Sequence, residues 1–102
     1  MCRCSLIGRL AGDVYYPEGL FKVARFTVVT NRGLPNGGER ADFHPCVLIG
    51  HKHMPRLENV KRGSLVYVSG PIERNKVNRD GQEVDEAVVM VKEIIPLGES
   101  TH

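Results

Sequence analysis

The sequence predicts a single all-β domain built from five strands. Apolar residues recur with a period of two in most segments, which is the spacing of a strand that buries one face. Clusters of glycine and proline separate these segments and are typical of turns. With 102 residues, of which 41% are hydrophobic and 25% charged, the chain has the size and composition of one folded domain. We therefore expect residues 1–102 to share one hydrophobic core.

The first two predicted strands cover residues 5–11 and 21–31. A turn at residues 15–19 joins them, because the proline and the glycine there supply a fixed and a positive φ angle. Residues 32–40 follow with three glycines, one proline and two arginines. This composition predicts a mobile, basic loop.

The third predicted strand covers residues 42–50 and has two distinct faces. Alternation places Phe43 and Ile49 on one face and His44 on the other. Pro45 has no backbone N–H to donate, which favours an edge position or a bulge at this point.

One short helix, residues 54–60, is predicted between the third and fourth strands. The fourth strand covers residues 64–76 and the fifth 83–95, and the Asp80-Gly81 pair between them is typical of a tight hairpin turn. Five strands, with a helix after the third and a long final hairpin, match the plan of the OB-fold, a five-stranded Greek-key barrel. Other small β-barrels are the alternative that strand count alone leaves open.

Charge is distributed unevenly along the chain. Residues 1–79 contain 13 of the 14 lysines and arginines and six acidic residues, whereas residues 80–102 contain one lysine and six acidic residues. The net charges of these two segments are therefore +7 and −5. A cationic domain is consistent with a polyanionic partner, and a solvated surface whose charges cancel in space is the alternative.

We expect no enzyme, no metal site and no cofactor. The chain has no GxSxG, P-loop or HExxH motif, and the adjacent acids at residues 85–86 alternate to opposite faces of a strand, so they cannot act as a carboxylate pair. Cys2 with Cys4 and His51 with His53 are metal-binding residue types, but CxC and HxH spacings are weak indications of zinc.

The expected location is the cytoplasm, in association with the nucleoid. No apolar run approaches the ~20 residues that cross a bilayer, and the first residues do not form a signal peptide. Three cysteines do not make an even disulfide framework, which favours a reducing compartment.

Six stretches resemble the bacterial single-stranded DNA-binding protein family. They are LIGRL at residues 6–10, VARFTVVTN at 23–31, DFH and VLIG within 42–50, KRGSLVYVSG at 61–70 and DGQE at 80–83. Together they span nearly the whole chain in the family's order. The resemblance implies an OB-fold that binds and protects single-stranded DNA, without sequence preference, in replication, recombination or repair. It also implies a homo-oligomer, with a tetramer favoured and a dimer as the alternative.

The resemblance also implies where the DNA lies. The family stacks bases on aromatic side chains, and the matching positions here are Leu34, Phe43, Ile49 and Val77, of which only Phe43 keeps a ring. We expect bases to lie on Phe43, Ile49 and Val77. We expect phosphates to be held by the surrounding cations, namely Arg25, Arg32, Arg40, Lys52, Arg56, Arg74, Lys76 and Arg79.

Subunit contacts follow from the same resemblance. The first strand pairs subunits in the family, which places Leu6 and Ile7 at the contact, and the family's equivalent of His44 also lies between subunits. Near the first turn, Tyr15, Tyr16 and Phe21 are candidates to compensate for the missing rings.

Two departures from the family keep other functions open. The chain ends without the Gly/Pro/Gln-rich linker and acidic tip that usually recruit repair and replication enzymes, so it is either a natural short form or a truncated one. A compact OB protein without that tail also resembles primosomal replication protein N, which acts in primosome assembly. The missing aromatic residues favour a further alternative, an OB protein-interaction module with weakened DNA binding.

Overall fold

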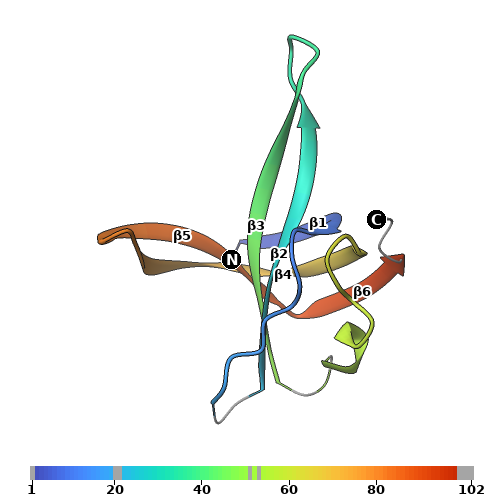
Figure 1. Cartoon of the computed structure of the whole chain (residues 1–102), viewed down its shortest axis with the longest axis vertical. Coiled ribbons are helices and arrows are strands. Elements are labelled where there is room, and N and C mark those ends of the chain that lie inside the picture. The colour runs from blue at the N-terminus through green and yellow to red at the C-terminus, as the bar shows by residue number, and fades with distance from the viewer. Residues whose placement is uncertain (1, 20–21, 51, 53, 99–102) are drawn as a thin grey trace.

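A computed structural model describes residues 2–19, 22–50, 52 and 54–98, apart from the side chains of Val77 and Arg79 (Figure 1). In chain order the elements are β1 (Arg3–Leu10), β2 (Val23–Gly33), β3 (Glu39–Ile49), the 3₁₀ turn η1 (Met54–Leu57), β4 (Leu65–Arg79), β5 (Gln82–Val91) and β6 (Glu93–Gly98). The prediction of an all-β domain is confirmed. The helix predicted at residues 54–60 is reduced to the single turn of η1.

Five strands close into a barrel. β1 pairs antiparallel with both β2 and β4, β2 pairs with β3, β3 pairs in parallel with β5, and β5 pairs back with β4. β6 continues β5 after a break at Lys92, whose N–H donates to the carbonyl oxygen of Ser69 at 2.8 Å. The predicted fifth strand is therefore one strand with a break, and this closed order confirms the OB-fold.

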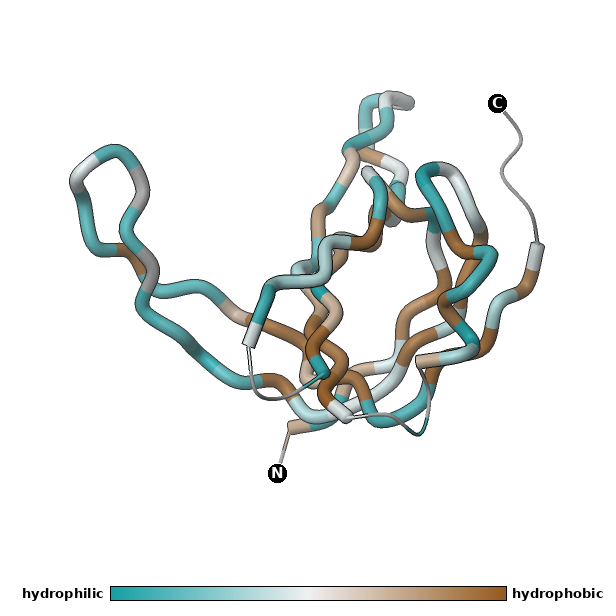
Figure 2. Tube along the Cα trace, turned by 60° about the horizontal axis from the view of Figure 1, so that its bottom comes forward, coloured by the Kyte–Doolittle hydropathy of each residue, from teal (hydrophilic) through white to brown (hydrophobic). Residues whose placement is uncertain are grey.

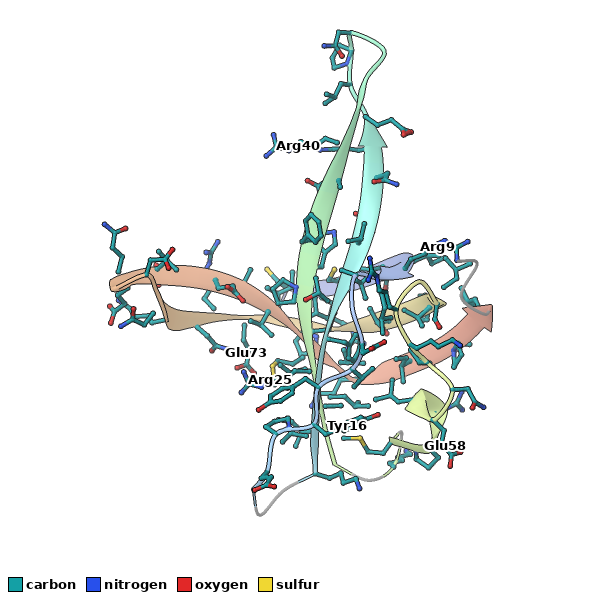
Figure 3. The ribbon with its side chains drawn as sticks, viewed as in Figure 1. Arg9, Tyr16, Arg25, Arg40, Glu58 and Glu73 are labelled. Carbon is teal, nitrogen blue, oxygen red and sulfur yellow. The ribbon has the colours of Figure 1, made fainter. Side chains whose placement is uncertain are left out.

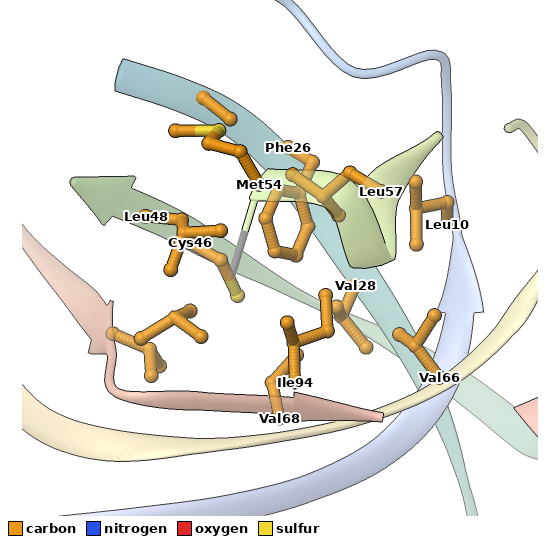
Figure 4. Close-up of a cluster of buried hydrophobic side chains, with 13 residues drawn as sticks. Leu10, Phe26, Val28, Cys46, Leu48, Met54, Leu57, Val66, Val68 and Ile94 are labelled. Carbon is orange, nitrogen blue, oxygen red and sulfur yellow. The ribbon is translucent and has the colours of Figure 1, made fainter. Parts of the chain in front are cut away.

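The core fills the inside of this barrel. Its buried side chains come from every strand and from η1, and the largest fully buried ones are Leu48, Leu57, Ile94, Val28, Val66, Val68 and Cys46 (Figure 4). Apolar residues gather in the barrel, whereas the projecting hairpins are mostly hydrophilic towards their ends (Figure 2). Burial raises the pKa of the Cys46 thiol to about 12. Alternate residues of β2 and β3 point inward as predicted, which leaves the other face of both strands for contacts outside the core.

The loop predicted for residues 32–40 is shorter than expected, because β2 extends to Gly33 and β3 begins at Glu39, so the predicted bounds were wrong. The two strands stay in register as far as the pair Gly33 and Glu39. The turn is closed by hydrogen bonds from Leu34 N–H to the Gly38 carbonyl at 2.7 Å and from Gly37 N–H to the Leu34 carbonyl at 3.0 Å. The glycine and proline cluster thus forms one tight turn, and the hairpin projects from the barrel (Figure 1).

A second hairpin, β4–β5, projects in another direction (Figure 1). Its turn has positive φ angles at Asp80 (54°) and Gly81 (82°), so the predicted tight turn is confirmed. Near Gly70, β4 exchanges its β6 partner for β5. A side chain at Gly70 would collide with the carbonyl oxygen of Met90, and glycine therefore permits this close approach.

Pro45 lies in β3 just before the segment that pairs with β5. Residues 39–45 of β3 pair with β2 on one side only, so the predicted edge position is confirmed. Within the described residues, no helix is long and apolar enough to span a membrane.

Candidate nucleic-acid interface

An open groove of about 690 Å³ runs over the outer face of β2 and β3. One boundary is the connection between β1 and β2, which contributes Asp13 and Tyr15. The other is the proximal part of the β4–β5 hairpin, which contributes Glu73 and Val88. The face of the second and third strands, bounded by these two connections, is the surface on which OB-folds bind oligonucleotides.

The groove contains two of the three predicted base-stacking residues. Phe43 and Ile49 lie on the outer face of β3 and are 63% and 55% exposed. The strand alternation that predicted their shared face is therefore confirmed. Val77 is paired with Val84 in the hairpin register, but its side chain lies outside the described residues. An exposed ring in an open groove has the geometry needed to stack on a base.

Tyr15 adds a second exposed ring. Its backbone is fixed to β2 by two hydrogen bonds of 2.8 Å, one in each direction, with Arg25. The Tyr15 side chain is 63% exposed and lines the groove. Tyr16 lines a different hollow with Met54, and Phe21 lies outside the described residues. Of the two compensating rings that the structure describes, Tyr15 lies in the groove and Tyr16 does not.

Of the predicted phosphate-binding cations whose side chains are described, Arg25 alone lines the groove. On the β2–β3 hairpin, Arg32 pairs directly with Arg40, and alternation puts both on the face of His44, opposite Phe43. Arg32 Nε also lies 3.1 Å from Asp42 Oδ2. Arg40 extends from the hairpin well away from Arg25 (Figure 3).

The β4–β5 hairpin also carries two of its predicted cations on the face turned away from the groove. Glu73 lines the groove, whereas alternation turns Arg74 and Lys76 to the reverse face of the hairpin. Lys76 Nζ lies 3.4 Å from Glu83 Oε1 on that face. Arg79 pairs with Gln82 beside the turn, and its side chain lies outside the described residues.

The last two predicted cations lie elsewhere. Lys52 is exposed in the connection after β3. Arg56 belongs to η1 and lines a hollow between this turn and β6, together with Leu97. Neither residue lines the groove that holds Phe43.

Acidic residues of the groove are what the sequence reasoning missed. Asp13, Glu73 and Glu86 line it together with Arg25, so its charged lining is mostly acidic. Asp13 Oδ1 accepts a hydrogen bond from the backbone N–H of Arg62 at 3.0 Å. The alternation of Glu73 with Arg74 along a predicted strand was the signal that could have separated the two faces of this hairpin.

The sequence of this chain matches a known protein family over most of its length. Residues 1–97 match the Single-strand binding protein family. The chain belongs to this family. The family resemblance predicted from the sequence is therefore confirmed.

Proteins similar in sequence to this chain are named single-stranded DNA-binding proteins. The chain is 38% identical over 101 residues to a Single-stranded DNA-binding protein of Bacillus cereus, covering 92% of this chain and 58% of that protein. It is 41% identical over 85 residues to Single-stranded DNA-binding protein 1 of Streptococcus pyogenes, covering 78% of this chain and 65% of that protein. The chain thus spans less than two thirds of the length of these relatives.

A solved structure shares the fold. The Plasmodium falciparum SSB in complex with ssDNA matches with a TM-score of 0.76 at 22% sequence identity, and the match covers 95% of each chain. The relatives named above are described as binding proteins and not as enzymes.

The predicted subunit-contact residues occupy different environments in this single-strand binding protein family member. Leu6 is half-buried and packs against the core, whereas Ile7 on the outer face is 61% exposed. His44 is half-buried, and its Nε2 lies 2.9 Å from the Thr30 hydroxyl oxygen. Residues 3–8 of β1 pair with β4 on one side, and pairing with β2 begins only at Arg9.

Proposed function

We propose that this chain binds single-stranded DNA without reading its sequence, and that it protects such DNA in replication, recombination or repair. The observation that carries the proposal is the exposed ring of Phe43, held on the outer face of β3 in an open groove. Membership of the Single-strand binding protein family and the names of its relatives support it.

In this proposal the bases lie inside the groove and the phosphates outside it. The walls offer apolar contacts from Phe43, Ile49 and Val88, which can receive the flat faces of unpaired bases. The acids on the walls repel phosphates. The cations on the reverse faces of both hairpins and in the remaining connections attract the backbone along the rims.

Fluorescence anisotropy tests the proposal directly. Labelled oligo-dT should bind at low salt, whereas a duplex of the same length should bind far more weakly, since paired bases cannot reach the groove. Equal affinity for the two would leave only non-specific electrostatic attraction and would refute the groove as the binding site.

A second candidate function has its own observation. The groove keeps few rings and has a mostly acidic charged lining, which suits an OB interaction module with weakened DNA binding, or a primosomal replication protein N-like role in primosome assembly. Failure of oligo-dT to bind the folded protein at low salt would favour the interaction module.

Self-association is part of the proposal. The outer face of β1, β4 and β6 exposes Ile7, Ile95 and Leu97 at 61%, 38% and 48%, and the register places Ile7 and Ile95 on either side of Tyr67. Together with the unpaired edge of β1 at residues 3–8, this face offers both a strand edge and an apolar surface to a second copy. We favour a tetramer, with a dimer as the alternative.

A further inference from the structure

The mostly acidic charged lining of the groove needs an explanation, because the chain as a whole has a net charge of +2. Glu73 and Arg25 both line it and lie near the point where the β4–β5 hairpin meets β2 and β3 (Figure 3). Among the described residues, the ion pairs within 4.0 Å join Arg32 to Asp42 and Lys76 to Glu83. No such pair neutralises the Glu73 carboxylate.

A carboxylate at this place is unsuited to the phosphate backbone but well suited to a base edge. Ionised Glu73 can only accept hydrogen bonds. The bases of single-stranded DNA expose their hydrogen-bonding edges. A glutamate can accept a hydrogen bond from the amino group of cytosine or adenine. Thymine presents a carbonyl oxygen where cytosine presents its amino group, and two acceptors facing each other repel.

Phe43 and Glu73 line the same groove from different strands. Phe43 is contributed by β3 and Glu73 by β4, which β5 joins to β3 in the sheet. A base whose flat face rests on the Phe43 ring directs its edge away from that ring, along the groove walls. Glu73 is exposed and lines the groove, so its carboxylate is available to such an edge.

We propose that Glu73 is a base-selecting residue, which accepts a hydrogen bond from the exocyclic amino group of a cytosine or adenine held in the groove. The inference rests on the proposed function, because it requires bases to enter this groove. It adds to sequence-independent binding a graded preference for amino-bearing bases over thymine.

The experiment compares labelled oligo-dC and oligo-dT of equal length by anisotropy, at one salt concentration and at a mildly alkaline pH where cytosine is unprotonated. Both strands are pyrimidine homopolymers, and the variants described next separate the contact of Glu73 from other differences between the two strands. We expect oligo-dC to bind about fivefold more tightly, the lower end of the range for a good contact to a base edge. Equal binding, or tighter binding of oligo-dT, overturns the role of Glu73 in base selection.

Two variants identify the residue responsible. Glu73→Gln keeps the shape and adds a donor that can meet the thymine carbonyl, so the ratio of the two affinities should fall close to one. Glu83→Gln removes the same charge from the reverse face of the same hairpin, where Glu83 pairs with Lys76, and should raise both affinities alike while keeping the ratio. A preference that survives in Glu73→Gln, or disappears equally in Glu83→Gln, overturns the assignment.

Failure of the proposed function gives a different result. If folded wild-type protein binds neither oligonucleotide, single-stranded DNA binding itself is refuted. If it binds both without preference, only the role of Glu73 is refuted. Thermal melting of both variants should match wild type, because both side chains are exposed.

Discussion

Replacing Phe43 with alanine separates a binding role from a structural one. The Phe43 side chain is 63% exposed, so it makes only about a third of the contacts of a fully buried phenylalanine. A fully buried phenylalanine costs about 3–5 kcal/mol when it is cut back to alanine. Scaling by contact gives about 1–2 kcal/mol of folding stability for Phe43→Ala. Loss of a stacking platform costs about 1–3 kcal/mol of binding, a 5- to 150-fold weaker affinity for single strands.

The assay pairs thermal melting with oligo-dT anisotropy on the same preparations. Phe26, which is 5% exposed on the inner face of β2, supplies the matched control, and Phe26→Ala should lower the melting temperature far more than Phe43→Ala. Phe43→Trp and Ile49→Phe should both tighten binding, because each enlarges the stacking surface of the groove. A large loss of melting temperature in Phe43→Ala, with no gain of affinity in Ile49→Phe, would show that the DNA-binding face is misplaced.

Three further predictions concern stability and assembly. Gly70→Ala should destabilise the fold by about 1–3 kcal/mol, since its new methyl group would meet the Met90 carbonyl, whereas Gly12→Ala, with nothing within 4 Å, should melt like wild type. Because burial raises the Cys46 pKa to about 12, the unfolded chain loses its thiol proton first, and stability should fall above about pH 9 by up to ~1.4 kcal/mol per pH unit. Urea unfolding at a series of alkaline pH values measures this loss of stability with pH, and the contribution of Cys46 should be absent in Cys46→Ala. Ile7→Glu should shift sedimentation from an oligomer to a folded monomer, and an unchanged oligomer would exclude the outer face of β1 from the contact.

Most of the correct predictions came from the alternation of apolar and polar residues within individual β-strands. It placed Phe43 and Ile49 outward and His44 on the opposite face, because a buried inner face constrains every second residue of a strand. The turn at Asp80 and Gly81 was also predictable, since few residues accept positive φ at both positions of a tight turn.

Loops and charges were harder to predict for a physical reason. Glycine and proline mark a turn but not the number of residues it takes, so the cluster at residues 32–40 was interpreted as a loop although the strands pair as far as Gly33. The cations were grouped because they lie on strands and loops around Phe43, whereas Arg74 and Glu73 are neighbours in sequence whose side chains lie on opposite faces. Which face turns towards the groove depends on how each hairpin leaves the barrel, and that is set by tertiary packing.

The division of charge between hairpin faces changes what salt should do to binding. For single strands, the slope of log K against log salt is about −0.7 for each phosphate neutralised. Direct contacts from all eight predicted cations would give a slope of about −6, whereas Arg25, the one of them whose described side chain lines the groove, would give about −0.7. Cations on the reverse faces attract the strand through solvent, an effect screened over about 8 Å at physiological ionic strength. Apolar contact with the bases must then supply most of the affinity that survives in moderate salt, which makes the one ring on β3 matter more here than in a groove lined with arginine.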